Sequence, residues 1–196
     1  MPEPAEKRPR RRDAAATRQA LLEAARARFT RHGYDGTTLR DVAADVGVNL
    51  ALIKRYFESK EGLFKAVLAS APRFGDDAGK FPRDRAALAE SLSRQLSGDA
   101  WPEFGEHPAL MLVRASGDER IEALRRQALE ELGRQLLDAT AAPDDAAHLL
   151  RAELVIALGV GVAVIRAGVG MQPLHDATPA DLVTPLRAVL DALFPR

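Results

Sequence analysis

The chain has 196 residues, with 28 lysines and arginines and 28 aspartates and glutamates, so its formal net charge is zero. It contains no cysteine, which excludes a disulfide framework, a thiolate metal site and a cysteine nucleophile. Residues 1–70 nevertheless carry 14 lysines and arginines against 9 acidic residues. This local excess of positive charge indicates a polyanionic partner for the first third of the chain.

Residues 1–12 form a basic N-terminal stretch with five lysines and arginines and no apolar periodicity. Like charges repel one another and stay solvated, so we expect a disordered arm. The alternative is an arm that follows phosphates or enters a minor groove beside a docked helix, and both hold if the arm becomes ordered only on DNA. No stretch behind it resembles a secretory signal.

The segment 13–70 opens with a predicted helix over residues 13–32. Leu21, Ala25 and Phe29 lie four residues apart and form one apolar stripe along this helix. A stripe of this kind indicates a helix that buries one side against its neighbours.

Two short helices follow, at about residues 39–45 and 49–57. Thr38 is expected to cap the first of them, and Asp41, three residues later, completes a pair like a capping box. Gly47 interrupts the chain between the two helices. Two short helices joined by a tight glycine turn predict a helix-turn-helix.

A longer series of residues, spread between Thr17 and Leu68, carries a resemblance to a known family. The series consists of Ala24-Ala25, Phe29, Gly33, Thr38-Leu39-Arg40-Asp41-Val42-Ala43, Gly47-Val48, Tyr56-Phe57 and Ser59-Lys60-Glu61-Gly62-Leu63. At these spacings it resembles the tetracycline-repressor-like (TetR) family of bacterial regulators. The resemblance implies a helix-turn-helix DNA-binding domain over residues 13–70, whose third helix enters the major groove.

The resemblance assigns DNA contacts to the two short helices and the start of the fourth helix. The matching positions are Thr38, Arg40, Asn49, Leu50, Ala51, Lys54, Tyr56 and Lys60. The capped helix N-terminus at Thr38 can face a phosphate, and the guanidinium of Arg40 can bind a guanine through two hydrogen bonds. Leu50 and Ala51 offer only apolar contacts, for instance to a thymine methyl.

Lys54 departs from the family, which very often has tyrosine at this position. A lysine still reaches a phosphate or a guanine, but it cannot stack as an aromatic ring does, and the alternative is a solvated helix residue. Tyr56 and Lys60 match phosphate-contacting positions, which set the register on DNA without reading its sequence. Ile53 and Phe57 are expected to face the core of the domain.

Residues 71–196 are predicted to form a second, wholly helical domain that serves ligand binding and dimerisation. The Gly- and Asp-rich residues 75–82 mark its boundary. The expected helices cover about residues 83–96, 108–116, 119–140, 144–168 and 179–194. No strand-like alternation bounded by hairpin turns is present in the sequence. We therefore predict an all-α fold of about nine helices.

The last two predicted helices carry the expected homodimer interface. Residues 154–165 are apolar on every face, so one side must be covered from beyond its own domain; this run of 12 residues is too short to span a membrane. Residues 151–193 also resemble a subgroup of the family in which the last two helices form a four-helix bundle with a second subunit. The alternative is a large monomeric core. The candidate interface residues are Leu158, Val162, Leu182, Leu186, Val189 and Leu193.

The resemblance also implies a cavity among the middle helices that binds a small-molecule effector of unknown identity. The candidate lining residues are Trp101, Phe104, Met111, Arg114, His148 and Arg166. Met and aromatic side chains at helical spacing are usually core residues, which is the alternative here. Arg114 and Arg166, if buried, need a carboxylate such as Glu153 or an acceptor on the ligand.

These features predict a cytoplasmic transcription regulator that binds an inverted-repeat DNA operator as a homodimer. We expect a repressor released by its effector, and the alternative is an effector-independent dimeric regulator. An enzyme is the competing class, but the four histidines lack metal-ligand spacing, and HExxH, GxSxG and phosphate-loop motifs are missing from the sequence. No cofactor, metal or membrane association is expected.

Overall fold

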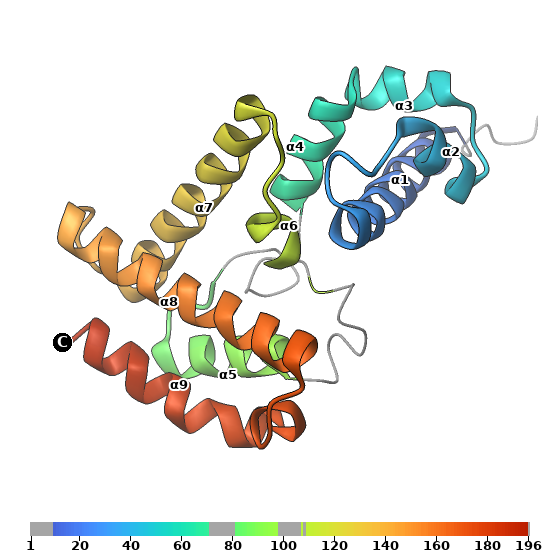
Figure 1. Ribbon diagram of the computed structural model, residues 1–196. Helices are drawn as coiled ribbons and strands as arrows, with labels where there is room; N and C mark the ends of the chain where they lie inside the picture. The colour runs from blue at the N-terminus through green and yellow to red at the C-terminus, as the bar shows by residue number, and fades with distance from the viewer. Residues whose placement is uncertain (1–9, 71–80, 98–106, 108, 196) are drawn as a thin grey trace, which may run out of the picture. The chain divides into compact units, whose positions relative to one another are not determined.

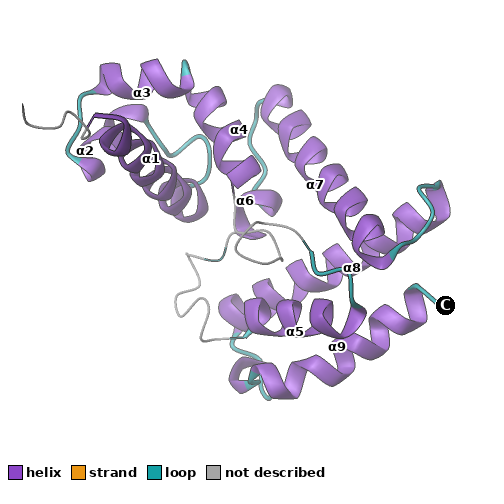
Figure 2. Ribbon diagram, turned by 180° about the vertical axis from the view of Figure 1, so that it is seen from behind, coloured by secondary structure: helices purple, strands orange, loops and turns teal. Residues whose placement is uncertain are grey.

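The computed structural model describes residues 10–70, 81–97, 107 and 109–195. Within these residues the chain forms nine α-helices, one π-helical turn and one 3-10 turn, and no strand (Figure 1, Figure 2). The prediction of an all-α fold of about nine helices is confirmed. The chain divides between Ala69 and Ser70 into two compact units.

The first unit contains four helices, α1 (Arg10–His32), α2 (Leu39–Val46), α3 (Leu50–Phe57) and α4 (Lys60–Ser70). The bounds of the first three lie within three residues of those expected. The largest difference is at the start of α1, which takes in the last three residues of the expected disordered arm. Residues 1–9 lie outside the described part of the chain.

The apolar sides of these helices form the core of the first unit. Helix α2 packs against both α1 and α3. The predicted stripe on α1 and the predicted inward orientation of Ile53 and Phe57 are confirmed. Burial of one large apolar side chain contributes about 1.5–3 kcal/mol. The buried apolar side chains are Leu21, Leu22, Ala25, Phe29, Val42, Ala43, Ile53, Phe57, Leu63, Phe64 and Val67.

Local sequence sets both ends of α2 and the start of α3. The Thr38 side chain accepts the backbone N–H of Asp41, whose carboxylate accepts the backbone N–H of Thr38, so the predicted capping box is present. Gly47 ends α2 with a φ of 69°, a left-handed conformation that costs glycine little. The side chain of Asn49 then caps α3 by accepting the backbone N–H of Ala51. The helix-turn-helix is thus specified by residues close together in the sequence.

The second unit is built on two helix pairs. Helix α5 packs along α9 (Figure 2), and α7 contacts α8. Helix α7 has the predicted bounds, whereas the helix expected at 144–168 is divided, because α8 ends at Val164 and a π-helical turn, Ile165–Val169, follows it. The helices are α5 (Arg85–Leu96), α6 (Ala109–Val113), α7 (Glu119–Thr140), α8 (Ala146–Val164) and α9 (Pro179–Leu193).

The apolar stretch of α8 is longer than the 12-residue run at residues 154–165 that the sequence analysis singled out. It is long and apolar enough, by length and composition alone, to span a membrane, with a mean hydropathy of 1.8 over 18 residues. The central helix of a folded domain meets the same criterion. Only 28% of that stretch is buried within the subunit, however. A large apolar surface of α8 is therefore left uncovered by the rest of the described chain.

Candidate nucleic-acid interface

Helix α3 presents a cationic outer face opposite its buried side. Ile53 and Phe57 point into the core at 0% and 5% exposure, whereas Ala51, Lys54 and Arg55 are exposed. Ala51 and Lys54 are predicted DNA contacts. Arg55 is missing from the predicted set, although its place four residues after Ala51 puts it on the same helical face.

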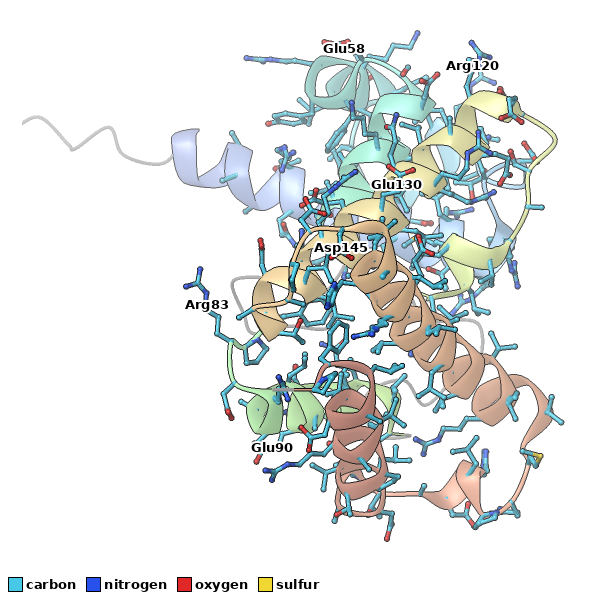
Figure 3. All side chains as sticks on the ribbon, turned by 90° about the vertical axis from the view of Figure 1, so that its left-hand side faces the viewer. Glu58, Arg83, Glu90, Arg120, Glu130 and Asp145 are labelled. Atoms are coloured by element: carbon cyan, nitrogen blue, oxygen red, sulfur yellow. The ribbon has the colours of Figure 1, made fainter. Side chains whose placement is uncertain are left out.

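The other predicted contacts on α2 and α3 differ in their exposure. Arg40 and Asn49 are exposed, whereas Leu50 and Tyr56 are half-buried. The side-chain oxygen of Asn49 accepts a backbone N–H of α3 at 2.9 Å, so its amide nitrogen is the donor that remains for DNA. Glu58, labelled in Figure 3, ends α3 and places one exposed carboxylate after the cationic face.

Thr38 has both of its donors engaged by one carboxylate. Its hydroxyl donates to Asp41 Oδ2 at 2.6 Å, and its backbone N–H donates to the same oxygen at 3.2 Å. The hydroxyl hydrogen bond is the main reason that the pKa of Asp41 lies below its ordinary value. Thr38 therefore cannot donate to a phosphate while the capping box is closed. The first backbone N–H groups of α2, at Leu39 and Arg40, lack a partner inside the helix and are the donors that a phosphate would meet.

Arg28 on α1 fixes α2 through an ion pair that is absent from the predicted set. Its guanidinium binds Asp45 with two hydrogen bonds, Nε to Oδ2 at 2.5 Å and Nη2 to Oδ1 at 2.7 Å, and Nη1 lies 3.7 Å from Asp41 Oδ2. The hydrogen bonds from Arg28 hold the pKa of Asp45 below its ordinary value. Arg28 thereby neutralises carboxylate charge on a helix that is expected to face phosphates.

Two further cations of this unit lie against aromatic rings. Lys60 Nζ is 4.2 Å from the centroid of the Tyr34 ring, and Arg18 Cζ is 5.3 Å from that of Phe57. Burial lowers the pKa of Lys60, and the carboxylate of Asp35 opposes that shift. Arg18 is exposed and is also absent from the predicted set, because the apolar pattern of α1 does not mark it.

Two of the four predicted dimer residues of α9 are buried inside their own subunit. Leu182 and Leu186 are buried at 8% exposure each, because the apolar stripe of α9 packs against α5. Val189 and Leu193 are half-buried, as is Val162 on α8. Leu182 and Leu186 therefore expose little surface to a second subunit, and the interface residues of α9 stay a prediction.

Helix α8 carries much of the exposed apolar surface of the second unit. Leu150 and Leu154 are 56% and 51% exposed, and Leu158, which belongs to the predicted set, is 38% exposed. These leucines lie four residues apart, and Ile165, at 37% exposure, follows them on the same side. A continuous apolar stripe of this length calls for a covering surface.

The predicted effector-site residues have dissimilar surroundings. Trp101 and Phe104 lie outside the described residues. Met111 is buried at 2% exposure, and Arg114 is half-buried. Glu153, the expected carboxylate partner for a buried arginine, is exposed on α8.

His148 and Arg166 make contacts that stabilise the fold. His148 donates its backbone N–H to Asp145 Oδ1 at 2.9 Å, so Asp145, labelled in Figure 3, caps α8. Arg166 is buried, and its guanidinium donates to the backbone oxygens of Leu96 and His175. Within the described residues, no group of three or more His, Asp or Glu side chains is placed to hold a metal ion.

Two protein-family models match most of the chain. The model for bacterial regulatory proteins of the tetR family matches residues 21–67, which contain α2 and α3. The model for the tetracyclin repressor-like C-terminal domain matches residues 86–194, which is more than half of the chain.

Curated relatives are similar to less than half of this chain. The HTH-type transcriptional dual regulator CecR of Shigella flexneri is 40% identical over 82 residues, which are 42% of this chain and 35% of that protein. The probable acrEF/envCD operon repressor of Escherichia coli K12 is 39% identical over 94 residues, 48% of this chain and 38% of that protein. The matched part thus spans little more than a third of each relative.

Solved structures match nearly the whole chain at low sequence identity. A TetR-family regulator, SCO0857, from Streptomyces coelicolor A3 has a TM-score of 0.62 at 21% identity, covering 98% of this chain and 100% of that chain. The multidrug binding protein EbrR complexed with malachite green has a TM-score of 0.59 at 24% identity, covering 91% and 98%. At these identities the likeness establishes the fold.

Proposed function

The chain belongs to the TetR family of bacterial regulatory proteins, which are DNA-binding transcriptional regulators and not enzymes, and we propose that it is a homodimeric repressor of an inverted-repeat operator. A small-molecule effector that binds the second unit releases it from DNA. We expect it to act in the cytoplasm, where the operator DNA of a bacterial regulator lies.

The outer face of α3 is the observation that carries the DNA-binding proposal. Ala51, Lys54 and Arg55 are exposed on one side of a short helix whose other side is anchored in the core. A helix fixed in this way, with two cations outward, suits insertion into a major groove. Ala51 leaves room for close approach to a base, and Arg40 supplies a guanidinium from the preceding helix.

The exposed stripe on α8 supports the homodimer. Leu150, Leu154 and Leu158 leave an apolar ridge in water in a lone subunit, and a second copy of the same ridge covers it by two-fold symmetry. Two DNA-binding domains related by that symmetry bind two half-sites of opposite orientation, about one DNA turn apart.

Release by an effector needs only a difference in affinity. A ligand that binds the DNA-incompetent arrangement more tightly shifts the population away from the operator. EbrR, which shares the fold, is described as a multidrug binding protein and holds malachite green in its structure. The family membership of residues 86–194 supports the same role for the second unit of this chain.

The experiment that tests this function selects bound fragments from random-sequence DNA at two salt concentrations. The wild-type protein is compared with a Lys54→Ala/Arg55→Ala variant and with Lys65→Ala, which removes an exposed cation from α4. We expect an inverted repeat for the wild type and for Lys65→Ala, and its loss in the α3 variant. Weak, salt-sensitive binding of the wild type without a motif would refute the operator proposal.

A thermal-shift screen of the protein with its selected operator tests effector release. Compounds that stabilise the free protein and weaken operator binding are the expected outcome. If every stabilising compound leaves operator affinity unchanged, the effector-independent regulator replaces the effector-released repressor.

A further inference from the structure

Lys60 occupies an unusual place for a cation, at the first residue of α4. The N-terminal end of a helix carries partial positive charge, so an ammonium there is repelled. Ser59 caps this end, accepting the backbone N–H of Gly62 at 2.9 Å. Burial further disfavours the charged form, as the lowered pKa of Lys60 records. Something must hold the ammonium in place against these effects.

The face of the Tyr34 ring provides that attraction. Lys60 Nζ lies 4.2 Å from the ring centroid, well inside the range of about 6 Å over which a ring face attracts a cation. The carboxylate of Asp35, next in the chain, also favours the charged form. The ring and this carboxylate together offset the positive end of α4.

The Tyr34 ring is itself held rigidly. It stacks on Phe29 with a centroid distance of 6.0 Å and meets Phe64 edge to face at 5.2 Å. Phe29 and Phe64 contact each other at 5.0 Å, and each is 1% exposed. The ring therefore cannot turn aside without disturbing the core, and it joins α1, the following turn and α4.

We propose that Tyr34 is a positioning residue for DNA binding, whose ring holds the Lys60 ammonium in the orientation in which it meets a phosphate. The inference rests on the proposed function, since it requires the phosphate contact of Lys60. An ammonium has three N–H donors, so contact with a ring face leaves donors for an anion. A lysine already ordered in the free protein loses less side-chain freedom on binding, which favours binding by about twofold to tenfold.

A double-mutant cycle on the selected operator tests the proposal. Tyr34→Leu, which keeps an apolar side chain but removes the ring, is expected to weaken binding about twofold to tenfold. The same change in a Lys60→Met background is expected to have no further effect, and Tyr34→Phe is expected to retain wild-type affinity. An equal loss from Tyr34→Leu in both backgrounds would mean that Tyr34 only stabilises the domain, and would overturn the proposal.

The Lys60→Met variant separates this proposal from the proposed function. Loss of one phosphate contact should make the slope of log affinity against log salt concentration less negative by about one. If Lys60→Met leaves both affinity and slope unchanged, the phosphate contact fails and the role of Tyr34 with it. If Lys60→Met makes the slope less negative but the effects of Tyr34→Leu and Lys60→Met on affinity simply add, only the proposed role of Tyr34 fails.

A direct measurement on the wild-type protein keeps the test decisive if Tyr34→Leu does not fold. The ε-carbon of Lys60 is bonded to the Nζ atom that lies over the Tyr34 ring, so its protons should resonate upfield of those of Lys65, which is exposed. We expect this upfield shift in the free protein and in the operator complex. Its disappearance on DNA binding would show that the ammonium leaves the ring, and would contradict the proposal.

Discussion

Two buried threonines near the end of α1 differ in how their hydroxyls are satisfied. Thr37 is 1% exposed, and its hydroxyl donates to the backbone oxygen of Gly33 at 2.9 Å. Thr30 is 0% exposed, and its hydroxyl has no hydrogen-bond partner in the described part of the chain. A buried polar group without a partner has a desolvation cost that nothing offsets.

Replacement of each threonine by valine, which has nearly the same shape, should therefore separate the two sites. Thr37→Val is expected to lower the free energy of unfolding by about 1 kcal/mol, because the Gly33 oxygen loses its donor. Thr30→Val is expected to be neutral or stabilising. Calorimetric unfolding of both variants measures the difference. Equal destabilisation by the two changes would contradict this account.

His107 makes the second unit sensitive to acid. Its ring is 6% exposed, and Nδ1 accepts the backbone N–H of Ala109 at 3.1 Å, which requires that nitrogen to be unprotonated. Burial lowers the pKa of His107 to about 4. The unfolded chain, with an ordinary histidine pKa near 6.5, takes up a proton first as the pH falls. Stability from this group is therefore present above pH about 6.5 and is lost between there and pH about 4.

Unfolding by urea at pH 7 and at pH 5 tests the role of His107. Because of His107, the free energy of unfolding should be lower at pH 5 than at pH 7 by about 2 kcal/mol. His107→Asn keeps a side-chain acceptor for the backbone N–H at the start of α6 and removes the titrating ring. The drop in the free energy of unfolding from pH 7 to pH 5 should therefore be smaller in this variant, by about 2 kcal/mol. His32→Asn, at an exposed histidine of α1, is the control. An acid dependence unchanged in His107→Asn would contradict the prediction.

Short-range interactions at single residues can be predicted from sequence, and long-range ones cannot. The capping box of Thr38 and Asp41 is predictable because its partners lie three residues apart on one helical turn. The ion pair of Arg28 and Asp45 joins residues 17 apart and depends on how α1 packs on α2. The contact of Lys60 with the Tyr34 ring is likewise unpredictable from sequence, because Tyr34 lies in the turn after α1 and Lys60 at the start of α4.

At the scale of elements, helix positions are predictable, and the surfaces that cover them are less so. Periodicity shows which residues of α9 share a face, but it does not show whether α5 or a second subunit covers that face. Leu182 and Leu186 are an example, because the structure shows them buried in the subunit, where α9 packs against α5. Residues 154–165 of α8 are apolar on every face, so only the structure shows that Leu150 and Leu154 lie on the outer side of the helix.

A charge placed on the outer side of α8 should separate the subunits without unfolding them. Leu154 is 51% exposed in a single subunit, so Leu154→Glu costs the monomer little. In a two-fold dimer it buries two like charges, and the dissociation constant should rise by at least about a hundredfold. Sedimentation velocity measures this change.

Val113→Glu is the matched control for the dimer prediction. Val113 is 49% exposed and belongs to α6, so it is not one of the residues of the stripe on α8. We expect the Val113→Glu protein to remain dimeric. A dimer that survives Leu154→Glu unchanged would remove this stripe from the interface.

For the whole molecule, the evidence for DNA binding and the evidence for the role of the second unit come from different parts of the chain. Residues 21–67 hold the motif that identifies a DNA-binding head, because groove insertion demands particular residues at particular spacings. Residues 86–194 identify the second unit by family membership, but the shape of the proposed effector site would depend on side-chain packing that no short motif encodes. The sequence therefore predicts the class of function better than it predicts the ligand.

The number of chains bound to one selected operator tests the central claim most directly. Sedimentation or native mass measurement of the complex is expected to give two chains on an inverted repeat, or pairs of chains if dimers bind side by side. Affinity should collapse when one half-site is scrambled. One chain on each operator, with affinity independent of the second half-site, would contradict the dimeric, operator-binding account.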